Sequence, residues 1–387
     1  MQLVEVNNKR TIKSFHQLPF RIYKNTKVWV PHLRQDIESV FDKKKNKQLR
    51  HGEAIRWILL DEKSEVIGRV AAFVNRKMKS GKIAVGGMGF FECINDKKSA
   101  FILFDACKKW LKKQDCQAMD GPINFGEKDK FWGLLVEGFD NPSVYANNYN
   151  PSYYQAFFED YGFKTYYNQH VAIREVTAPL QEKYKIRAER IAEDKDYTFD
   201  HIRKKEKLKY AEDFRIVYNK AWGNSFRNFK SMKQKQAISI INKMSPIMDE
   251  KIIWFAYYKN EPIAFSIFLP ELNEVFKYIN GNFNFFGKIK FWFLLKLKPP
   301  KNVHGVVFGV APEFQKKGVE GALAQQIAFQ FLESKKYKNI IMTWVGDFNP
   351  KMLKLIEGLG TTPYQKLKTY RLLFDKNAEF KRYPIHV

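Results

Sequence analysis

The chain has 387 residues, of which 45% are hydrophobic and 16% aromatic, so it exceeds the usual size of one domain and can bury two cores. Such a composition excludes long disordered regions. The formal net charge of +26 is spread over the whole length and favours anionic partners such as nucleic acid, an anionic membrane or an acidic cofactor, although a solvated lysine-rich surface would give the same charge.

The first half is predicted to begin with a helix over about 10–25. Two strands follow at 54–60 and 66–74, joined by the polar turn DEKSE, and a third strand lies near 85–94. This part of the sequence therefore predicts one helix and three strands.

The next helix is predicted from about Asp96, which suits the N-cap position. Its apolar residues recur at helical spacing and are Ala100, Leu103, Phe104, Cys107 and Leu111. A strand near 117–124 follows, and then a short helix that ends at Gly162. One face of that helix is aromatic and consists of Tyr154, Phe157, Phe158 and Tyr161.

The second half repeats this order after a charged stretch at 178–207, which is the predicted linker. Extra helices are expected at 208–222 and 231–245. The strands IIWFAYY and IAFSIFL flank the turn KNEP, and the strand VHGVVFGV comes later.

A helix from Gly318 to about Lys335 is predicted next, and its apolar stripe consists of Val319, Leu323, Ile327 and Phe331. After the strand NIIMTWV, a closing helix begins at Asn349. Its inward face is predicted to consist of Met352, Leu355, Ile356 and Leu359. YQKLKTYRLLF is the final strand. Both halves therefore run β-β-β-α-β-α, which predicts the α/β class with a mixed sheet, built twice.

The turn VAPEFQKKGVEGAL, at 310–323, leads from a strand into a helix. Successive backbone N–H groups at such a helix N-terminus bind a pyrophosphate through hydrogen bonds and the helix dipole. Gly318 would let the backbone approach a ligand closely, and Lys316 and Lys317 would add charge. An ordinary strand-to-helix turn that contains glycine is the alternative.

These motifs resemble those of the GNAT acyltransferases. Val310-Ala311-Pro312 followed by Gln315-Lys316-Lys317-Gly318 is similar to the family's V-x-P and Q/R-x-x-G-x-G/A, and the helix from Asn349 to Gly360 is similar to its second motif. The first half shows only that second motif, from Asn150 to Gly162-Phe163. The whole chain also resembles bacterial two-domain GNAT-like proteins in the stretches KVWVPHL, GFFECIND, GPINFGEKDKFWGLLVEGFD, YNPSYYQAFFEDYGF and LNEVFKYINGNF.

The resemblance implies a degenerate GNAT-like domain at 1–177, a linker at 178–207 and a GNAT-like domain at 208–387 that holds acetyl-CoA or another acyl-CoA. The residues that it places at the cofactor are Phe308, Val310, Gln315, Lys316, Lys317, Gly318, Val319, Gly321, Ala322 and Asn349. The corresponding loop of the first half, 93–99, has no glycine, so we expect that half to brace the other and to form one wall of a cleft.

Glu320 stands where the family has its second small residue. Either Gly321 supplies the close packing and Glu320 points to solvent, or the loop no longer binds CoA. The two readings separate an enzyme from a GNAT-shaped binding protein.

The resemblance further implies an acid that protonates the leaving thiolate and a base that deprotonates the amine. The usual acid is a tyrosine in the closing helix, where this chain has Ile356. Asp347, Tyr364 and Tyr370 are the candidate substitutes. Glu271 and Glu274 follow the second hairpin strand. Glu274 ranks first as the candidate base and His304 ranks second. The alternative for each is that the side chain is only solvated or has a structural role.

The segment 283–301 mixes large apolar residues with lysines. It is expected to form a basic amphipathic helix on an anionic membrane surface, a lid over the acyl pocket, or a segment whose aromatics pack against the first half.

The three cysteines and seven histidines show neither a disulfide framework nor metal-ligand spacing, so we expect a reducing compartment and no metal. Without an apolar leader or a run of membrane-spanning length, the chain is expected to be cytoplasmic. No nucleic-acid-binding motif accompanies the charge, so nucleic acid is not the expected partner. The sequence thus predicts an N-acyltransferase that moves an acyl group from acyl-CoA to an amine; an inactive acyl-CoA-binding protein and an aminoacyl-type transferase are the alternatives.

Overall fold

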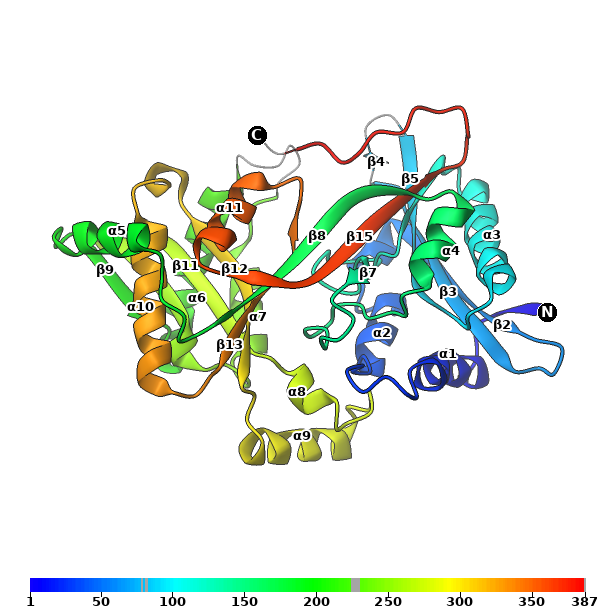
Figure 1. Cartoon of the computed structure of the whole chain (residues 1–387), viewed down its shortest axis with the longest axis horizontal. Coiled ribbons are helices and arrows are strands. Elements are labelled where there is room, and N and C mark those ends of the chain that lie inside the picture. Colours follow the sequence, from blue (N-terminus) through cyan, green and yellow to red (C-terminus); the bar gives the residue numbers. More distant parts are fainter. Residues whose placement is uncertain (78, 81–82, 224–229, 386–387) are drawn as a thin grey trace.

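The computed structural model describes residues 1–77, 79–80, 83–223 and 230–385, and in these residues the chain forms a 15-stranded mixed sheet with helices packed on it in each half (Figure 1). The strand order along the sheet is β1-β2-β3-β5-β6-β15-β8-β13-β12-β11-β10-β9, with β4, β7 and β14 paired at its side.

The first half contains the predicted elements in their predicted order, with further elements that were not predicted at 2–5, 34–41, 79–80, 134–137 and 164–175. Its helices and strands are β1 (Gln2–Glu5), α1 (Lys9–Ile22), α2 (Arg34–Phe41), β2 (Gly52–Leu60), β3 (Val66–Asn75), β4 (Lys79–Ser80), β5 (Ile83–Cys93), α3 (Lys97–Lys113), β6 (Ala118–Gly121), β7 (Leu134–Glu137), α4 (Tyr154–Tyr161) and β8 (Lys164–Glu175). Asp96 caps α3 through the backbone N–H of Ser99, and Gly162 ends α4 in the left-handed conformation, as predicted for both.

The second half also follows the predicted order. Its elements are α5 (Glu182–Ala192), β9 (Tyr197–His201), α6 (Lys207–Gly223), α7 (Gln234–Met244), β10 (Ile253–Tyr258), β11 (Glu261–Pro270), α8 (Asn273–Phe276), α9 (Phe285–Leu297), β12 (Asn302–Val310), α10 (Val319–Ser334), β13 (Asn339–Met342), β14 (Val345–Gly346), α11 (Pro350–Gly358) and β15 (Thr362–Leu373). The apolar stripe predicted for α10 is confirmed, because Val319, Leu323, Ile327 and Phe331 are all buried.

The two halves exchange their last strands. β8, which ends the first half, pairs antiparallel with β13 of the second half, whereas β15, which ends the chain, pairs antiparallel with β6 of the first. Between them β8 and β15 pair along almost their whole lengths, from Thr362 opposite Ile173 to Arg371 opposite Lys164. In Figure 1 these two long strands cross the middle of the molecule side by side and join the halves into one sheet.

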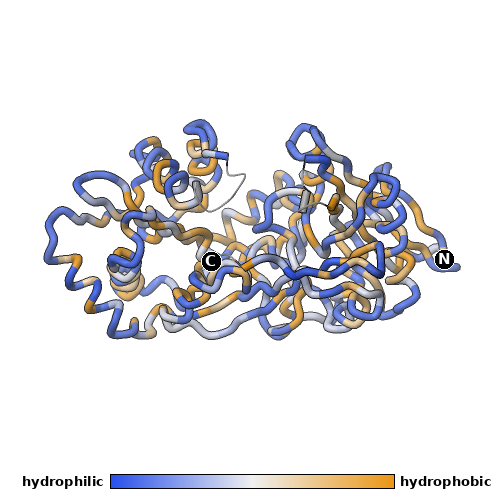
Figure 2. The backbone as a smooth tube through the Cα atoms, turned by 90° about the horizontal axis from the view of Figure 1, so that it is seen from above, coloured by the Kyte–Doolittle hydropathy of each residue, from blue (hydrophilic) through white to orange (hydrophobic). Residues whose placement is uncertain are grey.

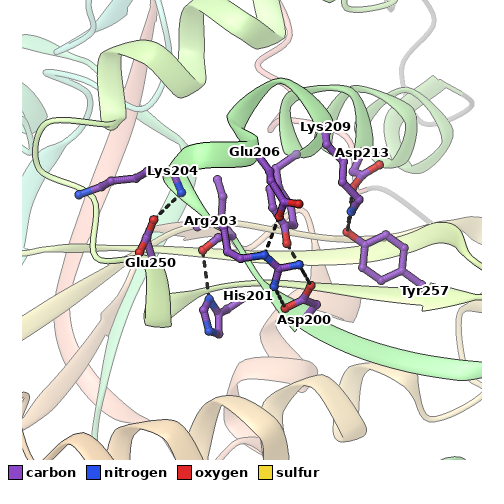
Figure 3. A network of polar contacts seen from close by, with 11 residues as sticks. Asp200, His201, Arg203, Lys204, Glu206, Lys209, Asp213, Glu250 and Tyr257 are labelled. Atoms are coloured by element: carbon purple, nitrogen blue, oxygen red, sulfur yellow. Dashed lines mark hydrogen bonds and ion pairs between the residues drawn. The ribbon is translucent and has the colours of Figure 1, made fainter.

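The stretch 178–207, expected as a linker, is largely built into the second half. β9 adds an edge strand to β10, and α5 packs on α10. Arg203 holds the segment after β9 in place, because its guanidinium donates to both carboxylate oxygens of Asp200, at 2.8 and 2.7 Å, and to Glu206 at 2.5 Å (Figure 3). Exposed ion pairs of this kind contribute little free energy, so their role here is to orient the entry into α6.

Each half buries apolar side chains on both faces of its part of the sheet. In the first half Phe91, Phe104 and Phe158 pack together between β5, α3 and α4, with Phe91 stacked on Phe104 and Phe158 edge to face with both. In the second half the corresponding core includes Phe268 and Phe331, packed edge to face. The outer loops of both halves are mostly hydrophilic in the hydropathy view, while apolar segments run through the interior of each (Figure 2).

Candidate functional site

The parallel strands β12 and β13 separate about halfway along β12. Their pairing runs from Asn302 opposite Asn339 to Gly305 opposite Met342, and a last backbone bond joins Thr343 N–H to Gly305 O at 2.9 Å. The chain then turns away, because β14 pairs with β8 instead. The edge of residues 306–310 that would continue towards β13 is therefore not paired with it, and unpaired strand edges bind extended ligands through backbone hydrogen bonds.

An apolar cavity of about 90 Å³ lies on the helix side of this opening, between α10 and α11, and we call it the helix-side cavity. The predicted inward face of the closing helix is confirmed here, because Met352, Leu355, Ile356 and Leu359 all line this cavity. Ala324 and Ala328 of α10 line its other wall.

A second cavity, of about 340 Å³, lies at the same strand opening and is called the central cavity. The two cavities share six lining residues, which are Ser266, Phe268, Phe308, Met342, Met352 and Ile356. The central cavity in turn shares Lys128 and Tyr383 with a third cavity, of about 430 Å³, in the first half (the N-terminal cavity). Because they share walls, the three cavities lie next to one another in a row from α10 into the first half.

The strand exchange gives each half an arginine from the other half's strand. Arg174 of β8 lines the helix-side cavity, and Arg371 of β15 lines the N-terminal cavity. Arg371 is neutralised, since it donates to both carboxylate oxygens of Asp120, at 2.6 and 2.8 Å, and lies 3.6 Å from the Tyr166 ring centre.

The guanidinium group of Arg174 has only part of its hydrogen bonds satisfied. It is 6% exposed, its Nη2 donates to the backbone oxygen of Ala178, and its Nε has no hydrogen-bond partner among the described residues. Burial lowers the pKa of this guanidinium. A buried cation with a spare donor in a mostly apolar cavity, whose other charged lining residue, Glu320, forms no ion pair with it in the described structure, is costly unless a ligand oxygen completes its hydrogen bonds.

The turn before α10 is already occupied by groups of this chain. The Glu320 carboxylate accepts the backbone N–H of Lys316 at 3.2 Å, so it folds back over the turn instead of extending into solvent. Gly318 has φ +101°, and a Cβ there would meet the Arg187 side chain at 3.1 Å. A Cβ at Gly321 would meet Tyr184 at 3.2 Å. In this conformation it is helix α5 that the two glycines allow to approach closely.

The same contact concentrates positive charge. Arg190 of α5 donates to the backbone oxygen of Lys317 at 2.9 Å, and Arg187 lies against Gly318. Arg187, Arg190, Lys316 and Lys317 thus all lie in or against the turn at the N-terminus of α10, which itself favours anions. Glu320 is the carboxylate that accepts from this turn.

The remaining residues predicted at the cofactor divide into three groups. Phe308 lines both the helix-side and central cavities, and Asn349, the N-cap of α11, lines the central cavity. Gln315 donates to Val310 O at 3.1 Å and so fixes the turn. The others are packed in the core of the second half and are Val310, Val319 and Ala322.

The corresponding opening in the first half is closed by protein. After β5 and β6 pair as far as Gly87 opposite Asp120, Ile123 N–H donates to Met88 O at 2.7 Å, and a Cβ at Gly89 would meet Ile123 O at 1.9 Å. At the N-terminus of α3 the Asp96 carboxylate accepts from Ser99. Backbone and carboxylate thus fill the places that a phosphate and an extended ligand would need.

The two candidate bases, Glu274 and His304, lie away from these cavities. Glu274 accepts the backbone N–H groups of Lys301 and Asn302, at 2.8 and 2.9 Å, and thereby fixes the start of β12. His304 lies on β12 opposite Leu269; burial lowers its pKa to about 4, and its Nε2 has no partner among the described residues. Neither residue lines one of the three cavities.

The candidate acids are likewise engaged elsewhere. Tyr364 donates to Pro142 O, Tyr370 donates to Glu159, and Asp347 accepts from Asn168 and Arg382. These contacts give all three a structural function.

Two side chains that sequence reasoning missed are the titratable groups lining the central cavity, namely Lys128 and Tyr383. The Lys128 ammonium lies 5.5 Å from the Tyr383 ring centre, and that ring packs on Phe348 at 4.6 Å. Burial raises the pKa of Tyr383, whereas burial lowers and Asp120 raises that of Lys128, with a net decrease. Lys128 belongs to the stretch GPINFGEKDKFWG, whose polar-aromatic mixture was the available signal.

A buried carboxyl group joins the halves at a second place. Glu271 accepts from the backbone N–H of Tyr145, at 2.9 Å, and of Asn273, at 3.0 Å, and burial raises its pKa to about 8. Nearby, Asn273 donates to Ser143 O at 2.7 Å. In the described part of the chain, no group of three His, Cys, Asp or Glu residues could hold a metal ion.

No protein-family model matches the sequence. Two curated proteins are similar to it over nearly their whole lengths. Protein YghO of Escherichia coli (strain K12) is 23% identical and aligns with 94% of this chain and 93% of its own. The bacterial ceramide synthase of Caulobacter vibrioides is 22% identical, over 96% of each chain.

Solved structures agree on the architecture. A tandem GNAT protein from the clavulanic acid biosynthesis pathway superposes with a TM-score of 0.54 and 9% identity, over 96% of this chain and 98% of its own. A GCN5-related N-acetyltransferase from Sphaerobacter thermophilus gives 0.52 and 8%, over 98% of each. The fold is therefore a tandem GNAT fold, as the order of elements and the two sequence motifs predicted.

Proposed function

We propose that the chain is an N-acyltransferase that moves an acyl group from acyl-CoA to an amine. The observation that carries the proposal is the opening between β12 and β13, which has an apolar cavity beneath α10 and α11 on one side and a separate cavity reaching the first half on the other. A thioester that enters from the helix side would present its carbonyl carbon to an amine that arrives from the other side.

The donor would lie along the opening. Its pyrophosphate would sit at the N-terminus of α10 among Arg187, Arg190 and the two lysines of the turn, with Glu320 displaced from Lys316 N–H. Its pantetheine arm would bond to the unpaired edge of 306–310, and an oxygen of the donor would complete the spare Nε of Arg174.

Reaction requires two proton transfers. The amine nitrogen forms a bond to the thioester carbon, the carbon–sulfur bond breaks, the amine gives up a proton and the CoA sulfur gains one. We assign the donation to Tyr383, a neutral phenol, and the acceptance to Lys128 as its neutral amine, the form that burial favours, because both line the cavity where the reacting atoms would meet. Glu274 and His304 stay as alternative bases that would need a water relay.

The apolar walls favour a long acyl chain over acetyl. The name of the Caulobacter relative, a ceramide synthase, refers to a product in which a fatty acyl group is amide-linked to a long-chain amino alcohol. We therefore propose an amphiphilic amine as the acceptor.

A binding protein without turnover is the second candidate. It is favoured by Glu320 and α5, which occupy the turn before α10. An aminoacyl-type transferase has no comparable observation in its support.

The test combines binding and turnover. Acyl-CoA at about 100 times its Kd should raise the free energy of unfolding by about 2.7 kcal/mol. Ala324→Phe, which fills the helix-side cavity, should abolish this shift and the release of CoA thiol in the presence of long-chain amines, whereas Phe329→Trp, at an exposed site of the same helix, should leave both intact. An unmodified chain that responds to no acyl-CoA would end the proposal, and binding without thiol release would favour the second candidate.

A further inference from the structure

Helix α9 is apolar on nearly every side, yet only part of it is covered. Phe291 is buried against Leu272, Val275 and Phe276 and is 1% exposed. Six other large apolar residues of this 13-residue helix are between 42% and 76% exposed, namely Phe285, Phe286, Ile289, Trp292, Phe293 and Leu297. The interpretation that the aromatics of this segment pack against the first half holds for Phe291, which also shares its cluster with Leu33.

The exposed residues form one continuous face. With 3.6 residues per turn, Phe285, Ile289 and Phe293 stack along the side opposite to Gly287 and Phe291. Lys288 and Lys290 project from the two flanks of that face, and Lys296 lies at its C-terminal end, on the same side as Phe285 and Ile289. An apolar face bordered by lysines is the pattern of a helix that lies in the plane of a membrane interface.

The chain segment that carries α9, between Glu274 and Glu313, has charge of one sign only. Residues 275–312 contain six lysines and no aspartate or glutamate. A second copy of this chain would bring the same lysines together, whereas anionic lipid headgroups would neutralise them. At the edge of the molecule where Figure 1 shows α9, next to α8 and below the sheet, the helix can meet a flat surface without moving either half.

We propose that α9 docks the protein on an anionic bilayer, with Phe285, Phe286, Ile289 and Phe293 inserted among the headgroups and acyl-chain ends. The helix is about 20 Å long, which suits an in-plane position. None of the helices in the described residues is both long and apolar enough to cross a membrane.

The experiment is flotation of the full chain with phosphatidylcholine vesicles that contain or lack phosphatidylglycerol. We expect flotation with the anionic vesicles and much less with the neutral ones. The variant Phe285→Ser/Phe286→Ser/Phe293→Ser should partition at least about tenfold less. Lys288→Glu/Lys290→Glu should cause a similar loss on anionic vesicles only. Leu208→Ser/Phe329→Ser/Leu332→Ser, a control at equally exposed apolar sites elsewhere, should float like the unchanged chain.

Three outcomes overturn the proposal. One is an unchanged chain that stays at the bottom of the gradient with both vesicles. Another is equal loss in the α9 variant and its control. The third is a dimer in sedimentation velocity that the α9 variant converts to a monomer while neither floats, which would assign the face to a second copy. No acyl-CoA is needed, so the result is independent of the proposed enzyme activity.

Discussion

The carboxylate of Glu320 accepts a hydrogen bond from the backbone N–H of Lys316, at 3.2 Å, across the turn that starts α10. That N–H belongs to the set of donors that a phosphate at this helix end would need. Glu320 therefore neither points away from the turn nor blocks the helix-side cavity outright, which it lines. It occupies a position for which a phosphate must compete.

We predict that Glu320→Gln binds acyl-CoA more tightly, by about fivefold, because the competing charge is gone while an amide oxygen still accepts from Lys316. The same change should lower the free energy of unfolding by about 0.3–1 kcal/mol, since a carboxylate near the positive helix end is stabilising. Calorimetric titration and denaturant unfolding measure the two effects. Glu333→Gln, at the opposite end of α10, is the control: it should leave acyl-CoA affinity unchanged and should not lower the free energy of unfolding. If it behaves like Glu320→Gln, the effect is one of net charge alone.

The exchange of β8 and β15 makes Arg174 a first-half residue in the second half's cavity. We predict that Arg174→Met lowers acyl-CoA affinity at least about tenfold, because the ligand loses a buried cationic donor. The free energy of unfolding should change by less than about 1 kcal/mol, since the variant also removes a charge that is costly to bury. Arg371→Met is the contrasting variant. It leaves the largely buried Asp120 carboxylate without its ion-pair partner and should destabilise the protein by about 3 kcal/mol or more. Full affinity in Arg174→Met would exclude Arg174 from the donor site.

Turnover should depend on Lys128 and Tyr383 while donor binding does not. We predict that Tyr383→Phe, which keeps the ring contact with Phe348, lowers kcat about a hundredfold, and that Lys128→Met does the same. Lys130→Met is the matched control, because Lys130 pairs with Glu127 and does not line the central cavity. Rapid-quench measurement of CoA release, with affinity determined separately, checks the prediction. If all three variants have the same kcat, Lys128 is not the base, and Glu274 and His304 become the candidates for that role.

Local patterns predicted the elements because helix and strand periodicity is set by neighbours in the sequence. The closing helix, with Ile356 and Leu359 facing inward, and the apolar stripe of α10 follow from spacing alone. The partners of β8 and β15 do not, since register and neighbour choice depend on contacts some 200 residues apart. For that reason the sequence could not place Arg174 beside α11 or Tyr383 beside Lys128, which are the relationships that build the site.

The pH dependence of stability should report on Glu271. Burial raises its folded-state pKa to about 8, above the ordinary value of 4.5, so the folded chain holds a proton there that the unfolded chain has lost. Its contribution is therefore fully present below about pH 4.5 and is lost as the pH rises through about 8.

His304, with its pKa lowered to about 4, affects the pH dependence of stability with the opposite sign, and mainly below its ordinary value of 6.5. We predict that Glu271→Gln flattens the decline in the free energy of unfolding between about pH 7 and 8, where most of the unfolded-state titration of His304, centred on 6.5, is complete. Urea unfolding at several pH values measures it, with Glu274→Gln, whose carboxylate also accepts two backbone N–H groups, as the matched control that should keep the decline. A Glu271→Gln profile parallel to that of the unchanged chain would show that Glu271 is ionised in the folded state throughout this range.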